Sequence, residues 1–124
     1  MSVKKRILVV DDEEAILLAF KKLLQRPNLE IDTCDTLEEA KLLIDSHIYS
    51  AVIADLRLSG TLGQEGFEII SYLKSKSSQS IAALITAYGS HGIEEKARAI
   101  GAEFYFEKPV SMKNLQEILG LIGE

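Results

Sequence analysis

Short apolar runs alternate with longer segments of helical period along the chain, and this alternation restricts the possible folds more than any other feature of the sequence. Three of the runs, at residues 7–10, 51–54 and 81–85, are apolar throughout. Runs of this length are typical of strands that are buried on both faces of a parallel sheet. The segments that follow them repeat apolar residues every three or four positions, as amphipathic helices do. The sequence therefore predicts strands that alternate with helices.

Local signals complete the pattern of elements. Residues 29–34 alternate apolar and charged side chains, as a half-exposed edge strand would, and residues 104–106 form a last short strand. Helices are expected over the apolar positions of residues 16–24, 37–44, 67–73, 93–100 and 115–122. Residues that favour helix ends flank four of them: Pro27 after the first, Thr36 before the second, Gly101 after the fourth and Ser111 before the fifth.

Five strands that alternate with five helices indicate an α/β fold, because parallel strands need crossover connections and these are usually helices. A flavodoxin-like doubly wound five-stranded parallel sheet, with strand order 2-1-3-4-5 and helices on both faces, fits best. This order places the three most apolar strands in the interior and the second and fifth at the edges. Ligands bind such sheets outside the carboxyl ends of the strands, where the winding reverses.

Length and composition exclude several classes of protein. A chain of 124 residues suits one domain over 1–124, and 47% of apolar residues is too much for a disordered chain. No apolar run approaches the roughly 18 to 20 residues of a membrane span, and no targeting signal is evident. The single cysteine, Cys34, favours a cytoplasmic protein. A net charge of -5 argues against direct nucleic-acid binding, which requires a basic surface.

Residues that can carry chemistry stand at the carboxyl ends of four predicted strands. Asp11 and Asp12 follow the first strand, Asp55 the third, Thr86 the fourth and Lys108 the fifth. The sheet would gather them at one edge, where two carboxylates about 4 Å apart repel each other by roughly 4 kcal/mol at an effective dielectric constant near 20. Lys108 supplies one positive charge. A hard cation that prefers oxygen ligands, such as Mg²⁺, would supply the rest.

Each of these residues also has an ordinary structural interpretation. An Asp pair after a strand is commonly a helix N-cap, Asp55 alone would be a turn or capping residue, and Thr86 is β-branched at a strand end. A Lys before a Pro is commonly a solvated side chain before a turn. The conjunction of all of them at the correct strand ends favours the functional interpretation.

The chain resembles the receiver domains of two-component response regulators, and is similar to the stand-alone chemotaxis regulator. The resemblance extends from Ile7 to Ile122 and rests on five motifs: Val9-Val10-Asp11-Asp12-Glu13, Ala54-Asp55, Thr86-Ala87, Gly101-Ala102 and Lys108-Pro109. It implies a phosphorylation-activated signalling switch of a phosphorelay. It does not imply an enzyme, beyond slow self-dephosphorylation at most.

The resemblance also implies the role of each site residue. Asp55 would accept a phosphoryl group from the phosphohistidine of a sensor histidine kinase or phosphotransfer protein. Mg²⁺ would be held by Asp12 and Asp55, by Asp11 through water and by the backbone carbonyl of Arg57. Lys108 and the hydroxyl of Thr86 would hold the phosphoryl oxygens, while the small Ala87 leaves the approach open.

A switch would follow from the added charge, which draws Thr86 and its loop inward. In the family an aromatic residue three positions before the lysine rotates inward, and here that residue is Tyr105. The responding face would comprise the fourth helix, the fifth strand and the fifth helix, where a downstream effector or a second copy docks. The peptide bond between Lys108 and Pro109 is expected to be cis.

The chain departs from the family in the loop after Asp55, which has Ser59 where proline is usual and reaches its Gly66-Phe67 step late. Arg57 and Tyr88 flank the site, and we expect them to tune the lifetime of the acyl phosphate. A receiver-like interaction module that is never phosphorylated is the alternative. A haloacid-dehalogenase-like phosphatase, a flavodoxin and a Rossmann dehydrogenase each lack a required motif here.

Overall fold

Strands and helices alternate strictly in the computed structural model, which describes residues 4–58 and 63–124. The elements run in the order β1 (Lys5–Val10), α1 (Glu14–Leu23), β2 (Leu29–Cys34), α2 (Leu37–Ser46), β3 (Ala51–Asp55), α3 (Glu65–Lys76), β4 (Ile81–Thr86), α4 (His91–Ala99), β5 (Phe104–Glu107) and α5 (Met112–Leu121). None of the helices in the described ranges has both the length and the apolar character that a membrane span requires.

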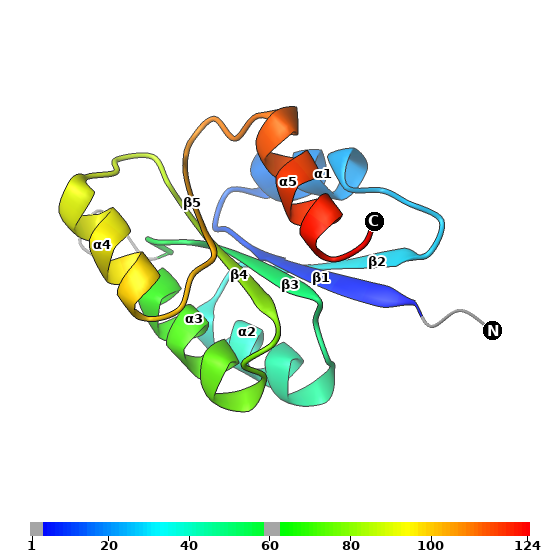
Figure 1. Ribbon diagram of the computed structural model, residues 1–124, viewed down its shortest axis with the longest axis horizontal. Helices are drawn as coiled ribbons and strands as arrows, with labels where there is room; N and C mark the ends of the chain where they lie inside the picture. The colour runs from blue at the N-terminus through cyan, green and yellow to red at the C-terminus, as the bar shows by residue number, and fades with distance from the viewer. Residues whose placement is uncertain (1–3, 59–62) are drawn as a thin grey trace.

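The strands form one parallel sheet in the order β2-β1-β3-β4-β5 (Figure 1). This is the predicted fold class and strand order, and both are confirmed. The strands begin or end slightly beyond the apolar runs, because backbone pairing continues past them: Lys5 of β1 pairs with Leu29 of β2, and Thr86 of β4 pairs with Glu107 of β5. The two predicted edge strands, β2 and β5, lie at the edges.

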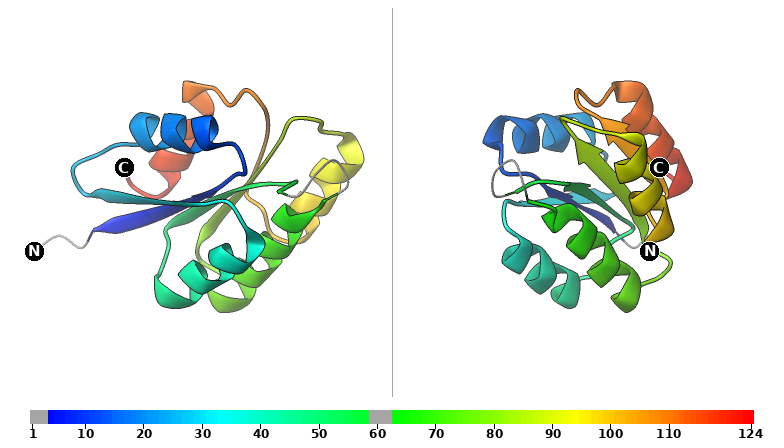
Figure 2. Two further views of the ribbon diagram at one scale, coloured as in Figure 1. Left: turned by 180° about the vertical axis from the view of Figure 1, so that it is seen from behind. Right: turned by 90° about the vertical axis from the view of Figure 1, so that its left-hand side faces the viewer.

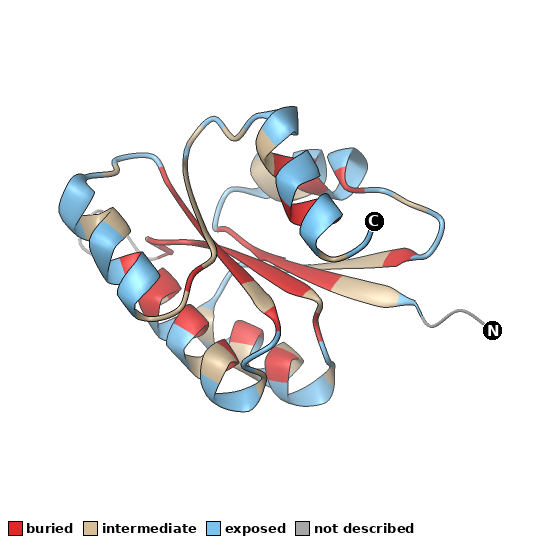
Figure 3. Cartoon of the chain, viewed as in Figure 1, coloured by how far each residue is buried: buried red, intermediate tan, exposed pale blue. Residues whose placement is uncertain are grey.

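Helices cover both faces of the sheet, with α1 and α5 on one face and α2, α3 and α4 on the other (Figures 1 and 2). Successive side chains of β1 point to opposite faces, so Ile7 and Val9 pack with Phe20 of α1, while Leu8 and Val10 belong to the cluster on the other face. Most residues of the three inner strands are buried (Figure 3). The apolar runs therefore form the core, as predicted.

Capping residues define several helix ends as the sequence predicts. The side chain of Thr36 accepts a hydrogen bond from the amide of Glu39 at the start of α2, and Ser111 forms a capping box with Asn114 at the start of α5. Gly101 follows α4 with φ of 109°, a left-handed conformation that glycine adopts without strain.

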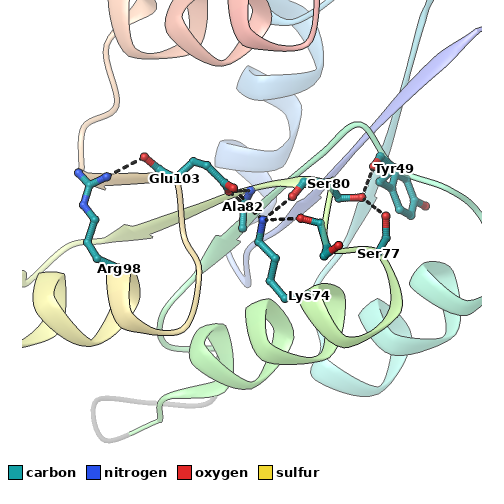
Figure 4. Close-up of polar contacts among 8 residues, drawn as sticks. Tyr49, Lys74, Ser77, Ser80, Ala82, Arg98 and Glu103 are labelled. Carbon is teal, nitrogen blue, oxygen red and sulfur yellow. Dashed lines mark hydrogen bonds and ion pairs between the residues drawn. The ribbon is translucent and has the colours of Figure 1, made fainter.

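A cluster of polar side chains connects the C-terminal end of α4 to the region of the sheet where β4 begins (Figure 4). Lys74 of α3 lies 2.8 Å from the carboxylate of Glu103 and donates to the carbonyl of Ser80 at 2.6 Å. Glu103 also accepts from the amide of Ala82 at 2.8 Å, and Arg98 of α4 donates to the carbonyl of Glu103 at 2.7 Å. These contacts join α3, β4 and the connection between α4 and β5.

Candidate functional site

The strand register brings the predicted site residues to one edge of the sheet. Val10 of β1 pairs with Ala54 of β3, so that Asp11 and Asp55 end neighbouring strands side by side. Thr86 is the last residue of β4, the next strand along the sheet. Asp11 is 0% exposed, Asp55 5% and Thr86 2%. The sequence therefore places three polar side chains in the interior at the carboxyl end of the sheet, where burial makes their interactions strong.

Lys108 extends from the end of β5 into this group of acids. Its amide donates to the carbonyl of Thr86 at 2.8 Å, which fixes the backbone. Its ammonium nitrogen lies 2.9 Å from Asp11 Oδ2, 3.3 Å from Asp55 Oδ2 and 3.6 Å from Glu13 Oε1, and the side chain is only 12% exposed. One ammonium thus faces three carboxylates. Glu13 was not among the residues predicted for the site, although it adjoins the Asp pair in the sequence.

The electrostatics of the site disfavour charge on its carboxyl groups. Burial, and next the nearby Asp11, raise the pKa of Asp55 from 3.8 to about 6, although Lys108 opposes the change. Burial also raises the pKa of Asp11. Burial lowers the pKa of Lys108, but Asp11 and Asp55 outweigh it, so the pKa of the ammonium is raised overall. The lysine is therefore charged at neutral pH and does not fully compensate the acids.

The carboxylates form a donor set that suits a hard divalent cation. Asp11, Asp12 and Asp55 each offer an oxygen, and these oxygens lie within 4.8 Å of one another. All are carboxylate oxygens, the ligand type that Mg²⁺ prefers, and Asp12 is exposed, which leaves room for the waters that Mg²⁺ retains. The residues present therefore fit the predicted ion.

A pocket of about 170 Å³ opens above Asp55. It is lined by Asp12, Glu13, Asp55, Arg57, Thr86, Ala87, Tyr88 and Lys108. Ala87 contributes no bulk to it, and Tyr88 is 75% exposed. The hydroxyl of Thr86 accepts from the amide of Tyr88 at 3.3 Å, a contact within its own loop. The pocket can admit a group of phosphoryl size beside an acidic oxygen, an ammonium and a hydroxyl.

The ordinary structural interpretation of the Asp pair holds only in part. Asp11 Oδ1 accepts a hydrogen bond of 2.9 Å from the amide of Glu13, so this carboxylate does order the turn before α1. The N-cap of α1 is Glu13 rather than either aspartate, and its side chain makes no capping hydrogen bond. Asp12 is therefore available to a ligand at the pocket.

Other predicted features lie beside the pocket rather than in it. The Lys108-Pro109 bond is cis, the isomer expected from the sequence. Tyr105 does not line the pocket, and it packs against the core on the α2, α3 and α4 face. In the long loop after Asp55, residues 59–62, with Ser59, lie outside the described residues, and α3 begins at Glu65.

Comparisons with known proteins identify the family. The model of the response regulator receiver domain matches residues 7–120. The chain belongs to this family. The receiver domain is 28% identical over 116 residues to the response regulator protein PilR of Pseudomonas aeruginosa. This alignment covers 94% of this chain and 25% of PilR. It is 30% identical over 115 residues to the transcriptional regulatory protein PdtaR of Mycobacterium tuberculosis, covering 92% of this chain and 54% of PdtaR.

Solved structures agree with the receiver fold. A CheY-like receiver domain protein from Methanospirillum hungatei is 25% identical with a TM-score of 0.84, covering 95% of this chain and 92% of that one. The beryllofluoride-activated NtrC4 receiver domain dimer is 32% identical with a TM-score of 0.78, covering 94% and 92%. The predicted family is thus confirmed. Receiver domains are signalling domains rather than enzymes in the ordinary sense, and the chain spans only 25% of PilR.

Proposed function

We propose that this receiver domain is a phosphorylation-activated switch that accepts a phosphoryl group on Asp55. The observation that carries the proposal is the setting of that carboxylate: its side chain is 7% exposed, lies 3.3 Å from the ammonium of Lys108 and opens on the pocket described above. Phosphoryl transfer depends mainly on positioning and on neutralising charge, and this site supplies both. The phosphodonor would be the phosphohistidine of a sensor histidine kinase or a phosphotransfer protein.

The proposed reaction forms one bond and breaks one. A carboxylate oxygen of Asp55 attacks phosphorus in line with the leaving nitrogen of the phosphohistidine. The new O–P bond forms as the P–N bond breaks, and the imidazole nitrogen keeps the electron pair and takes up a proton. Lys108 and the hydroxyl of Thr86 then bind the phosphoryl oxygens of the acyl phosphate. Slow attack of water on the same phosphorus would return the domain to rest.

Asp11, Asp12, Asp55 and the backbone carbonyl of Arg57 are the proposed ligands of Mg²⁺. The bound ion would neutralise negative charge on the phosphoryl oxygens as the transition state forms. The protein's part is to hold these oxygens close together, and Lys108 and the turn at Glu13 fix the orientation of Asp11.

The proposed output is a change at the surface of α4, β5 and α5. The acyl phosphate brings about -1.5 to -2 charges to a site whose acids already outnumber its bases. Thr86 would move toward these oxygens and shift the loop that leads to α4, and Tyr105 would respond from β5. A downstream effector or a second copy of the domain would dock on this surface. We place the domain in the cytoplasm, without direct contact to nucleic acid or membrane.

Intact-mass measurement tests the proposal. The parent and Asp55→Asn would be incubated with Mg²⁺ and a small phosphodonor such as an acyl phosphate, with EDTA as the control for metal dependence. We expect one labile phosphoryl group on the parent in Mg²⁺, and none on the variant or in EDTA. The proposal would be contradicted if the parent gained no phosphoryl mass under conditions that phosphorylate another receiver domain. That result would favour an interaction module that is never phosphorylated.

A further inference from the structure

Tyr105 of β5 holds its hydroxyl in a covered position beside the loop that joins β4 to α4. Within the part of the chain that the structure describes, this hydroxyl is buried and makes no hydrogen bond of good geometry. Burial, and next the carboxylate of Glu107, raise the pKa of the phenol. The backbone of Ser90 interacts with the hydroxyl and lowers its pKa, but not in the geometry of a good hydrogen bond, so polar contacts stabilise this position of the ring only weakly.

The space that the hydroxyl occupies exists because residue 89 is glycine. A Cβ atom on Gly89 would stand 1.8 Å from the Tyr105 hydroxyl oxygen, and 2.9 Å and 3.0 Å from Cγ and Cδ of Glu107. A contact of 1.8 Å between unbonded heavy atoms is impossible. The backbone of Gly89 does not itself require glycine, since the positive-φ glycines of the described chain are Gly101 and Gly123.

We propose that Gly89 is a positioning residue for Tyr105, and that its missing side chain keeps open the buried position that the hydroxyl end of the ring occupies in this structure, hereafter its seat. Any Cβ at residue 89 would displace the ring outward, because the clashing atom is the far end of a rotatable side chain. This inference rests on the proposed function in one respect, the part that Tyr105 plays in the output. The steric relation between the two residues holds regardless of it.

The location of Gly89 connects the seat to the phosphorylation site. Gly89 is three residues after Thr86, and the loop between them carries Tyr88 at the rim of the pocket. A movement of Thr86 toward the phosphoryl oxygens would therefore move the wall of the seat. The C-terminal end of α4 is held by the hydrogen bond from Arg98 to the carbonyl of Glu103. A shift of the loop would therefore move the N-terminal end of the helix.

Residue-resolved chemical modification of tyrosine measures whether Tyr105 leaves its seat. Nitration with tetranitromethane, followed by peptide mass mapping, would be applied to the metal-free, unphosphorylated parent and to Gly89→Ala. The chain has four tyrosines. Tyr88 is 75% exposed and serves as the internal standard for fast nitration, and Tyr49 is 2% exposed and serves as the standard for slow nitration.

We expect nitration of Tyr105 to rise about tenfold or more in Gly89→Ala, because an outward state populated at roughly 10% or less becomes dominant. Gly92→Ala is the matched control, since a Cβ there meets only the Ser90 hydroxyl at 4.0 Å, and its Tyr105 should react as in the parent. An unchanged rate at Tyr105 in a folded Gly89→Ala protein would overturn the proposal, as would an equal rise in Gly92→Ala.

A second comparison keeps the test decisive if Gly89→Ala folds poorly. The hydroxyl is the only Tyr105 atom among the three nearest neighbours of the added Cβ, so Tyr105→Phe should relieve the defect. Gly89→Ala should then cost less urea stability in the Tyr105→Phe background than in the parent, and an equal cost in both would contradict the proposal. Neither measurement needs phosphorylation, so a parent that takes up no phosphoryl group would overturn only the proposed function.

Discussion

Replacing Asp55 by asparagine should stabilise the metal-free receiver domain at neutral pH. Asp55 is buried to 5% exposure beside Asp11, and the two acids share one ammonium. Burial, and next Asp11, raise its pKa, which means that the folded state disfavours the ionised carboxylate relative to the unfolded chain. Asparagine has nearly the same shape and keeps an acceptor oxygen for Lys108 but carries no charge. The substitution therefore removes a repulsion without opening a cavity.

The magnitude follows from the pKa. A rise from 3.8 to about 6 corresponds to about 3 kcal/mol at neutral pH, because each pKa unit is worth ~1.4 kcal/mol. Part of this gain is lost, since a neutral amide binds the ammonium of Lys108 less strongly than a carboxylate does. We expect a net stabilisation of about 1–3 kcal/mol in the absence of metal.

The difference in stability between Asp55→Asn and the parent does not change sign with pH, but it develops only over a limited range of pH. Below the unfolded-state value of 3.8, Asp55 is protonated in both states and the variant gains nothing. As the pH rises through that value, the unfolded chain loses its proton first, and the parent loses stability relative to the variant. Above the folded-state value of about 6 the difference is complete and constant.

Urea unfolding followed by circular dichroism measures the difference, since the chain contains no tryptophan. The parent, Asp55→Asn and Asp12→Asn would be compared at pH 4 and pH 7.5, with EDTA and with Mg²⁺. Asp12 is exposed, so in EDTA its variant should lie within about 0.5 kcal/mol of the parent. Mg²⁺ at about a hundred times its dissociation constant should add about 2.7 kcal/mol to the parent, and much less to either variant.

The reasoning fails if Asp55→Asn is no more stable than the parent in EDTA at pH 7.5, because the burial penalty would then not exist. It fails equally if the gain is as large at pH 4 as at pH 7.5, since a gain independent of ionisation would come from packing. If Asp12→Asn matched Asp55→Asn in EDTA, general loss of negative charge would explain the result instead.

Three further substitutions test separate parts of the structure. Arg57→Ala should lose the acyl phosphate roughly two to ten times faster, because Arg57 lines the pocket and would shield the acyl phosphate from water there; intact mass against time measures this, and an unchanged rate would remove Arg57 from that role. Lys108→Met should cost about 3 kcal/mol at pH 7 by leaving two buried carboxylates without their cation. This loss should shrink in acid, and a loss of equal size at pH 4 by thermal melting would argue against the charge explanation. Lys74→Met should cost about 1–3 kcal/mol by unpairing Glu103 and the carbonyl of Ser80, yet leave phosphoryl uptake unchanged.

Residues whose role follows from the end of a strand could be predicted from the sequence. A run such as 51–54 is buried on both faces, and the next residue in a parallel sheet lies at the ligand-binding edge. This reasoning predicts the positions of Asp55, Asp11 and Thr86, and the structure brings the three residues together. Strand order followed from the same apolar pattern, because only inner strands must be apolar on both faces.

Contacts between side chains of separate elements could not be predicted in this way. Lys74 and Glu103 look like ordinary surface charges, and nothing in their sequence context indicates that they meet between α3 and the start of β5. The contact of Glu13 with Lys108 depends on the turn of the chain after Asp11. The seat formed by Gly89 requires the position of a ring sixteen residues later in the chain.

The excess of acids over bases at the site explains why phosphorylation should be felt at a distance. At neutral pH the folded domain already carries the cost of an ionised Asp55, and phosphorylation would replace that single charge by about -1.5 to -2 charges on the phosphoryl oxygens beside it. Lys108 is already engaged by Asp11, Asp55 and Glu13, so it cannot supply much more. The hydroxyl of Thr86 is at present an acceptor within its own loop, and its proton is free to be donated to an oxygen that arrives in the pocket. Because that loop also contains Gly89, the proposed movement that relieves the new charge would also alter the seat of Tyr105.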